Sequence, residues 1–68
     1  MDEEALNHTI RKFLKTVGVT AQREIEIAVR TAIAEGRLRG DERLPAHAAI
    51  SVSGLNLDFR IDGQIELE

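Results

Sequence analysis

The residues whose side chains could do chemistry are few, and they lie apart in the sequence. His8 falls among charged residues, and His47 stands at the start of an alternating segment, each without a neighbouring ligand set. Both are better interpreted as surface residues than as a zinc or acid–base site. Ser51 and Ser53 have no nucleophile elbow around them. We therefore expect no catalytic residue, no metal and no cofactor, and we expect that the protein is not an enzyme.

Four carboxylates near the end of the chain alternate with apolar residues and should share the outer face of a sheet. They are Asp58, Asp62, Glu66 and Glu68. Their oxygens suit a hard cation, but the spacing lacks the ordered loop of a calcium hand. We interpret them as a solvated acidic face, which also discourages aggregation of a small open sheet. The glycines of "GRLRG" form no phosphate-binding motif.

Composition bounds the class of protein. The chain has 68 residues, 43% of them hydrophobic, with two Phe as its only aromatic residues and no Cys. We therefore expect one domain over residues 1–68 with a thin core and no disulfide. The acidic start is not a secretory signal, and no apolar run approaches the roughly 20 residues of a membrane span. These features predict a cytoplasmic protein without a membrane segment.

The net charge of −3 is unevenly distributed. Residues 5–40 carry seven Lys or Arg against three Glu, whereas both flanking segments are acidic. The basic residues provide a candidate interaction surface, and Ile27 joins them as a single apolar residue on a polar helical face. The full candidate set is Arg11, Lys12, Lys15, Ile27, Arg37, Arg39 and Arg43.

Hydrophobic spacing predicts two amphipathic helices. The first covers residues 3–17, and Gly18 suits the left-handed residue after its end. Its core-facing stripe consists of Leu6, Ile10, Phe13, Leu14 and Val17. The second covers residues 21–35 after a Thr20 cap and stops at Gly36. We expect a tight pair of helices.

After residue 46 the period changes from 3.6 to 2, which predicts strands at residues 47–52, 55–61 and 64–67. A two-residue Ser53-Gly54 turn would pair Val52 with Leu55. At the second turn we favour residues 61–63 with Gly63 left-handed, which pairs Phe59 with Ile65. A shifted turn would instead pair Arg60 with Glu66. The predicted fold is α+β, a two-helix hairpin packed on one face of a three-stranded antiparallel meander in the order α-α-β-β-β.

Two DNA-binding patterns are only local. "AVRTAIAEGRL" with "LP" resembles the opening of GntR-type winged-helix repressors, but a strand pattern follows where that family needs a helix. Gly18-Val19-Thr20 resembles a helix-turn-helix turn, but Leu14 and Glu24 occupy positions that need a small and an apolar residue.

The segments "IRKFLKTVGVT", "QREIEIAVRTAIAEGRLRG", "LPA" and "GLNLDFRIDGQIEL" together resemble a family of short bacterial proteins of unknown function. That resemblance implies one domain and carries no activity or cofactor. We expect a non-catalytic protein-interaction module whose partner is an unidentified protein or a second copy of the chain, as a homodimer. The alternative is weak nucleic-acid binding through the basic residues of the first helix and the 37–43 linker. Net acidity and the lack of aromatic stacking residues make nucleic acid the less favoured partner.

Overall fold

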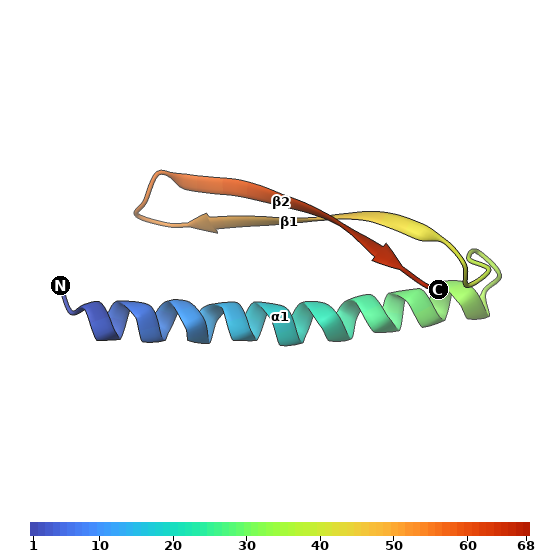
Figure 1. Cartoon of the computed structure of the whole chain (residues 1–68), viewed down its shortest axis with the longest axis horizontal. Coiled ribbons are helices and arrows are strands. Elements are labelled where there is room, and N and C mark those ends of the chain that lie inside the picture. The colour runs from blue at the N-terminus through green and yellow to red at the C-terminus, as the bar shows by residue number, and fades with distance from the viewer. The chain divides into compact units, whose positions relative to one another are not determined.

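The structure is a computed structural model that describes residues 1–68. It contains one helix, α1 (Glu3–Ala34), and two strands, β1 (Arg43–Val52) and β2 (Leu57–Glu66), in that order (Figure 1). The chain forms two compact units, which we call the helix unit (Met1–Arg37) and the hairpin unit (Leu38–Glu68). The predicted arrangement of two helices and three strands is therefore wrong, although the chain does combine helix with antiparallel strands.

The start of α1 is capped by a side chain. The Asp2 carboxylate accepts hydrogen bonds from the backbone N–H of Glu4 at 3.0 Å and of Ala5 at 3.2 Å. Glu3 and Glu4 occupy the first turn, where negative charge is favoured by the helix dipole. The predicted start of the first helix is confirmed.

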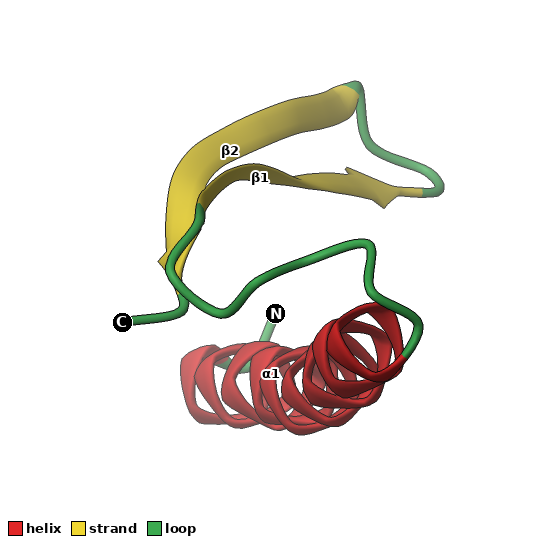
Figure 2. Ribbon diagram, turned by 90° about the vertical axis from the view of Figure 1, so that its right-hand side faces the viewer, coloured by secondary structure: helices red, strands yellow, loops and turns green.

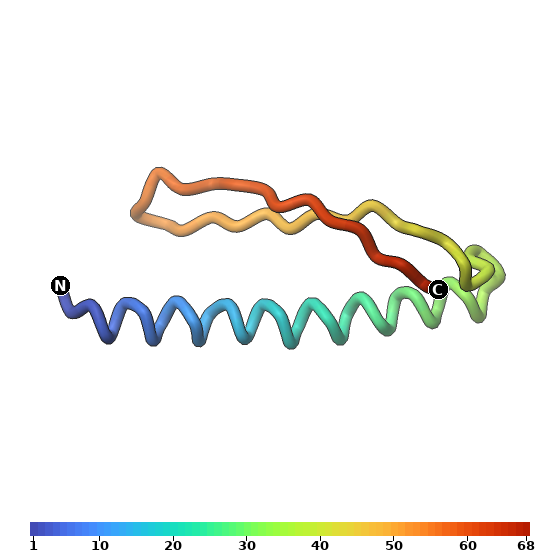
Figure 3. The backbone as a smooth tube through the Cα atoms, viewed as in Figure 1, coloured from blue at the N-terminus to red at the C-terminus, as the bar shows by residue number.

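One helix replaces the two that were predicted, because α1 continues through Gly18, Val19 and Thr20 (Figure 3). Gly18 does not have a positive φ, so it is an ordinary helical residue and not a stop. A glycine inside a helix costs about 1 kcal/mol relative to alanine, which a long helix tolerates when its apolar residues stay in phase.

The apolar residues on both sides of Gly18 do stay in phase. Ile10, Ala21 and Ala32 are spaced eleven residues apart, which is three turns of nearly straight helix. At roughly 100° per residue, nine apolar residues lie within about a third of the circumference. We call this set the apolar stripe, and its members are Leu6, Ile10, Phe13, Leu14, Val17, Ala21, Ile25, Ala28 and Ala32.

α1 stops before Gly36, as the sequence predicted for the second helix, and its end forms a Schellman motif. Gly36 has φ 78°, and its N–H donates to the carbonyl of Ile33 at 3.1 Å. The N–H of Arg37 reaches back to the carbonyl of Ala32 at 2.9 Å. Both bonds satisfy carbonyls that a helix end otherwise leaves without partners.

The two strands form one antiparallel hairpin (Figure 2). Its closing pair is Val52 with Leu57, so residues 53–56 form the turn, and the N–H of Leu55 donates to the carbonyl of Val52 at 3.2 Å. Gly54, with φ 88°, supplies the left-handed residue. The predicted two-residue turn, and the pairing of Val52 with Leu55, are wrong.

The predicted second turn at Gly63 is also absent, and the strands predicted at 55–61 and 64–67 are one strand. Gly63 lies within β2 opposite Ala46 and does not have a positive φ. Leu57, Phe59 and Ile61 on one side of it continue into Ile65 with unbroken alternation, so a straight strand keeps all of them on one face. β1 correspondingly begins at Arg43 instead of residue 47 and includes Pro45.

Alternation divides the hairpin into two faces. The apolar sheet face consists of Leu44, Ala46, Ala48, Ile50, Val52, Leu57, Phe59, Ile61, Gly63 and Ile65. The polar sheet face consists of Arg43, Pro45, His47, Ala49, Ser51, Asp58, Arg60, Asp62, Gln64 and Glu66.

Burial is slight in both units. Ala32 is the only buried residue, and it is 6% exposed. Large apolar side chains remain open to solvent in the helix unit, where Phe13 is 51% exposed, and in the hairpin unit, where Ile61 is 55% exposed. We expected two helical stripes packed on a three-stranded sheet. The structure instead has one helical stripe and one apolar face on a two-stranded sheet.

Candidate interaction surface

The histidines and serines lie in separate surroundings. His8 is exposed in the first half of α1, whereas His47 lies on the polar sheet face opposite Asp62. Ser51 is opposite Asp58, and Ser53 is in the turn. The chain contains no group of three or more His, Cys, Asp or Glu side chains that could hold a metal ion.

The carboxylates predicted to share a sheet face do so in part. Asp58, Asp62 and Glu66 lie on the polar sheet face, while Glu68 follows the end of β2. Arg60 stands between the two aspartates, and its Nε is 2.7 Å from Oδ1 of Asp62. Because β1 and β2 both supply arginine to this face, its charge is mixed and not purely acidic.

The basic candidates do not form one cluster. Arg11, Lys12 and Lys15 lie in the first half of α1, and none of them takes part in the ion pairs of the chain. Arg37 pairs with Glu35 just after the helix. The basic candidates therefore fall into two groups. The three on α1 form no ion pair, whereas those after the helix lie near acidic residues.

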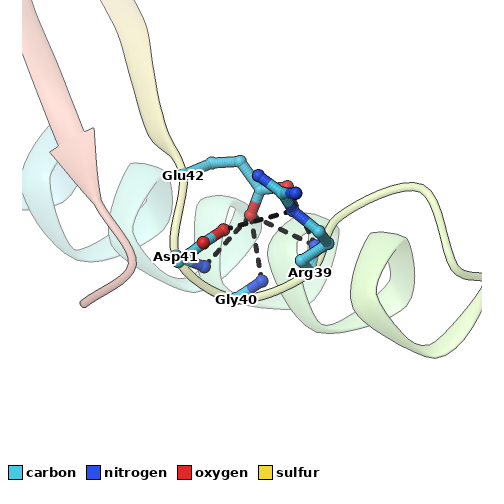
Figure 4. A network of polar contacts seen from close by, with 4 residues as sticks. All are labelled: Arg39, Gly40, Asp41 and Glu42. Atoms are coloured by element: carbon cyan, nitrogen blue, oxygen red, sulfur yellow. Dashed lines mark hydrogen bonds and ion pairs between the residues drawn. The ribbon is translucent and has the colours of Figure 1, made fainter.

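The segment between α1 and β1 contains an anion site that is filled by the chain itself (Figure 4). The Glu42 carboxylate accepts hydrogen bonds from the backbone N–H groups of three preceding residues. The distances are 2.9 Å from Arg39, 2.9 Å from Gly40 and 3.2 Å from Asp41. Gly40 has φ 114°, a conformation that favours glycine and turns its amide toward the carboxylate.

This geometry has an electrostatic consequence. The N–H groups of Arg39 and Gly40 lower the pKa of Glu42 below its ordinary value of 4.5, because they stabilise the ionised carboxylate. Arg39 in turn lies with its Nε 3.4 Å from Oδ1 of Asp41. Two linker arginines, Arg37 and Arg39, thus face acidic partners, and Arg43 lies opposite Glu66.

The Glu42 site was missed by sequence reasoning because backbone N–H donors leave no side-chain pattern. The available signal was Gly40 two positions before a glutamate. A glycine that can take a positive φ and an acceptor within reach of its amide together favour such a turn.

Ile27 is 51% exposed, as expected of an apolar residue on a polar helical face. It is not exceptional, however. Within the apolar stripe, Phe13 is equally exposed at 51%, Leu14 is 47% exposed and Ile10 is 46% exposed. The sequence had assigned these residues to the core, so the larger exposed apolar surface was missed.

A comparison with protein-family models matches the whole chain. Residues 1–68 match a family of unknown function, DUF6494. The chain belongs to this family. The expected membership in an uncharacterised family is therefore confirmed, and the match covers the helix unit and the hairpin unit of the DUF6494 chain alike.

No curated protein and no solved structure matches this DUF6494 chain. In addition, α1 is not apolar enough along any long stretch to cross a membrane.

The surfaces of the DUF6494 chain can thus be ranked by what they offer a partner. The linker pairs Arg37 and Arg39 with acidic residues, and the polar sheet face pairs Arg60 with Asp62. The apolar stripe and the apolar sheet face expose side chains whose transfer from water is favourable by about 25 cal/mol for each Å² covered. Apolar contact is the stronger candidate for binding.

Proposed function

We propose that this protein is a non-catalytic module for protein association, in which the apolar stripe of α1 is covered by another protein surface. The observation that carries the proposal is that one residue, Ala32, is buried, while fourteen large hydrophobic residues are at least 39% exposed. Contiguous exposed apolar surface is typical of interaction sites, whereas isolated exposed residues are not informative.

The stripe has the form of a helical recognition surface. Ile10, Phe13, Leu14 and Val17 follow the i, i+3, i+4, i+7 spacing by which amphipathic helices bind partners. The opposite side of this part of α1 carries Arg11, Lys12 and Lys15, which keep the helix solvated. A partner surface that is apolar at its centre and acidic at its rim would complement both features.

A matched pair of variants tests the association. Leu14→Lys places a charge within the stripe, and His8→Lys places the same charge on the polar side of the same helix. Light scattering over a concentration series should give the wild-type chain a mass above 7.6 kDa. Leu14→Lys should return the mass toward the monomer, and His8→Lys should not. A wild-type chain that unfolds cooperatively and remains at monomer mass would contradict the proposal, because such a chain would be stable without another protein covering its apolar stripe.

Nucleic-acid binding is the second candidate, and one observation favours it. Arg11, Lys12 and Lys15 lie together on α1 without a carboxylate in ion-pair contact. Against it stand the internally paired Arg37 and Arg39 and the presence of only two aromatic residues. It predicts binding of short duplex DNA at low salt that weakens steeply as salt is raised. Replacing the three residues with Ala together should then abolish the binding.

The cytoplasmic setting expected from the sequence remains part of this proposal. Cell fractionation with an antibody against the chain would test it directly.

A further inference from the structure

One edge of the hairpin carries an unbroken row of free backbone groups. The N–H of Leu67 donates to the carbonyl of Glu42 at 3.0 Å, which fixes the phase of the hydrogen-bond ladder between the strands. Because bonded and non-bonded pairs alternate in an antiparallel pair, every second residue of each strand points its N–H and C=O outward. On β2 the outward residues are Asp58, Arg60, Asp62, Gln64 and Glu66.

The outer edge of β1 is different. Its outward residues include Pro45, which has no N–H to donate. Proline in a strand is confined to such edges, and it interrupts pairing with a further strand. β2 therefore offers the better edge for strand addition, and no further strand of the chain pairs with its outer edge.

We propose that two copies of this chain join through β2, antiparallel about a two-fold axis at Ile61, to form one four-stranded sheet. The proposal rests on the proposed function of protein association, and it adds a second contact, between the β2 strands of two copies, beside the one on the apolar stripe. The sheet order would be β1, β2, then β2 and β1 of the second copy.

Charge complementarity favours this register over either one-residue shift of the axis. With the axis at Ile61, Arg60 lies opposite the partner's Asp62, and symmetry repeats that pair. Asp58 lies opposite the partner's Gln64. Arg60 and Asp62 already contact each other along β2 at 2.7 Å, so the two copies would join two ion pairs into one alternating set of four charges. Opposite charges on facing strands stabilise a sheet, and like charges destabilise it.

Shifting the axis by one residue brings like charges together. With the axis at Arg60, this residue would face its own copy, and Asp58 would face the partner's Asp62. With the axis at Asp62, this residue would face its own copy, and Asp58 would face the partner's Glu66. The axis at Ile61 avoids all of these contacts.

The apolar sheet face agrees with the same register. Ile61 would lie opposite its own copy, and Leu57 would lie opposite the partner's Ile65. Phe59 would lie opposite the partner's Gly63, where an added Cβ now meets no atom within 4 Å. Aromatic residues opposite glycine recur in sheets because the ring covers the space that glycine leaves open. The pairing would also convert a two-stranded hairpin, which is marginal by itself, into a sheet wide enough for independent stability.

Cysteine cross-linking tests the edge and the register together, since the chain has no cysteine of its own. In the proposed sheet, Ile61 and its copy form a non-hydrogen-bonded pair, with Cα atoms about 4.5 Å apart. This separation is within the range of a disulfide. Ile61→Cys should therefore form a disulfide-linked dimer under mild oxidation.

Two matched variants act as controls. Gly63→Cys would face the partner's Phe59, and Ala49→Cys lies on β1, so neither should cross-link at a comparable rate. Faster cross-linking at residue 63 would place the axis two residues away, and faster cross-linking at residue 49 would place the contact on β1. Either result would overturn the proposal. A mass above that of the monomer without cross-linking at residue 61 would overturn it too, yet leave the association function standing.

A charge swap gives a second test that leaves Ile61 in place. Arg60→Asp and Asp62→Arg each put like charges opposite one another, and each should raise the dimer dissociation constant about tenfold. The double variant restores opposite charges and should return the constant close to that of the wild type. Single variants that dimerise as well as the wild type would refute the register.

Discussion

The N–H of Arg37 donates to the carbonyl of Ala32 at 2.9 Å, across the end of α1, and Gly36 between them has φ 78°. This bond closes the helix, which ends two residues after its one buried residue, Ala32. The chain can turn there because glycine has no Cβ to oppose a positive φ.

Gly36→Ala should therefore destabilise the protein by about 1–2 kcal/mol, although an added Cβ would meet no other atom within 4 Å. Urea unfolding at fixed protein concentration measures the change. A loss below about 0.3 kcal/mol would contradict the left-handed conformation, because only backbone strain is at issue here.

Gly18→Ala should change the stability in the opposite direction to Gly36→Ala. In a continuous α1, alanine at this position should stabilise the helix by about 0.5–1 kcal/mol, and its Cβ meets no atom within 4 Å. If the chain turned at Gly18 with a positive φ, the same substitution would be destabilising. Thermal unfolding followed by circular dichroism at 222 nm distinguishes the two, with Gly36→Ala as the comparison.

Gly63→Ala should likewise stabilise the hairpin, by about 0.5–1 kcal/mol, because Gly63 is a strand residue opposite Ala46. The predicted left-handed turn would make the change unfavourable. Amide hydrogen exchange of β2 provides the measurement, and slower exchange of the neighbouring amides is expected. Gly54→Ala, at φ 88°, is a suitable control because it should speed exchange.

Glu42 should make stability depend on pH in the acid range. Its pKa is lowered in the folded chain by the amides of Arg39 and Gly40, so it adds stability above its ordinary pKa of 4.5. That contribution is lost as the pH falls from 4.5 through the lower, folded pKa. Glu42→Gln should be less stable than the wild type at pH 7, and the difference should shrink at pH 3.

The check is a series of melting temperatures between pH 3 and 7. Glu24→Gln is the control, since the Glu24 carboxylate accepts no hydrogen bond within the chain. A difference between wild type and Glu42→Gln that stays constant over this range would show that the amides do not hold the carboxylate.

The sequence was sufficient to predict a helical first half and a stranded second half. It was not sufficient to predict that the helix and the last strand each run on without a break. Gly18 and Gly63 were both interpreted as breaks, since glycine is the residue most often found at them. In each case the correct signal was periodic: Val17 and Ala21 are four positions apart across Gly18, and Ile61 and Ile65 are four apart across Gly63. Four residues is close to a helical turn and is also two strand repeats, so the pattern continues in both conformations without a shift of face.

The candidate surface was predictable to a smaller extent. Ile27 was correctly placed outside the core, yet Phe13 and Leu14 were expected inside it. A periodic apolar stripe indicates which side of a helix avoids water, but it does not indicate whether the cover comes from the same chain. The Glu42 site depends on backbone direction, which residue identities alone do not specify.

Pro45 limits the number of strands that the sheet can add at its edges. In a sheet of two copies joined at β2, both outer edges are β1 edges, and each lacks one N–H where a further strand would bind. Edge strands that can still pair lead to open-ended fibrils, whereas blocked ones end the sheet. A single proline therefore allows this small chain to present a free strand to one copy of itself and remain a finite particle.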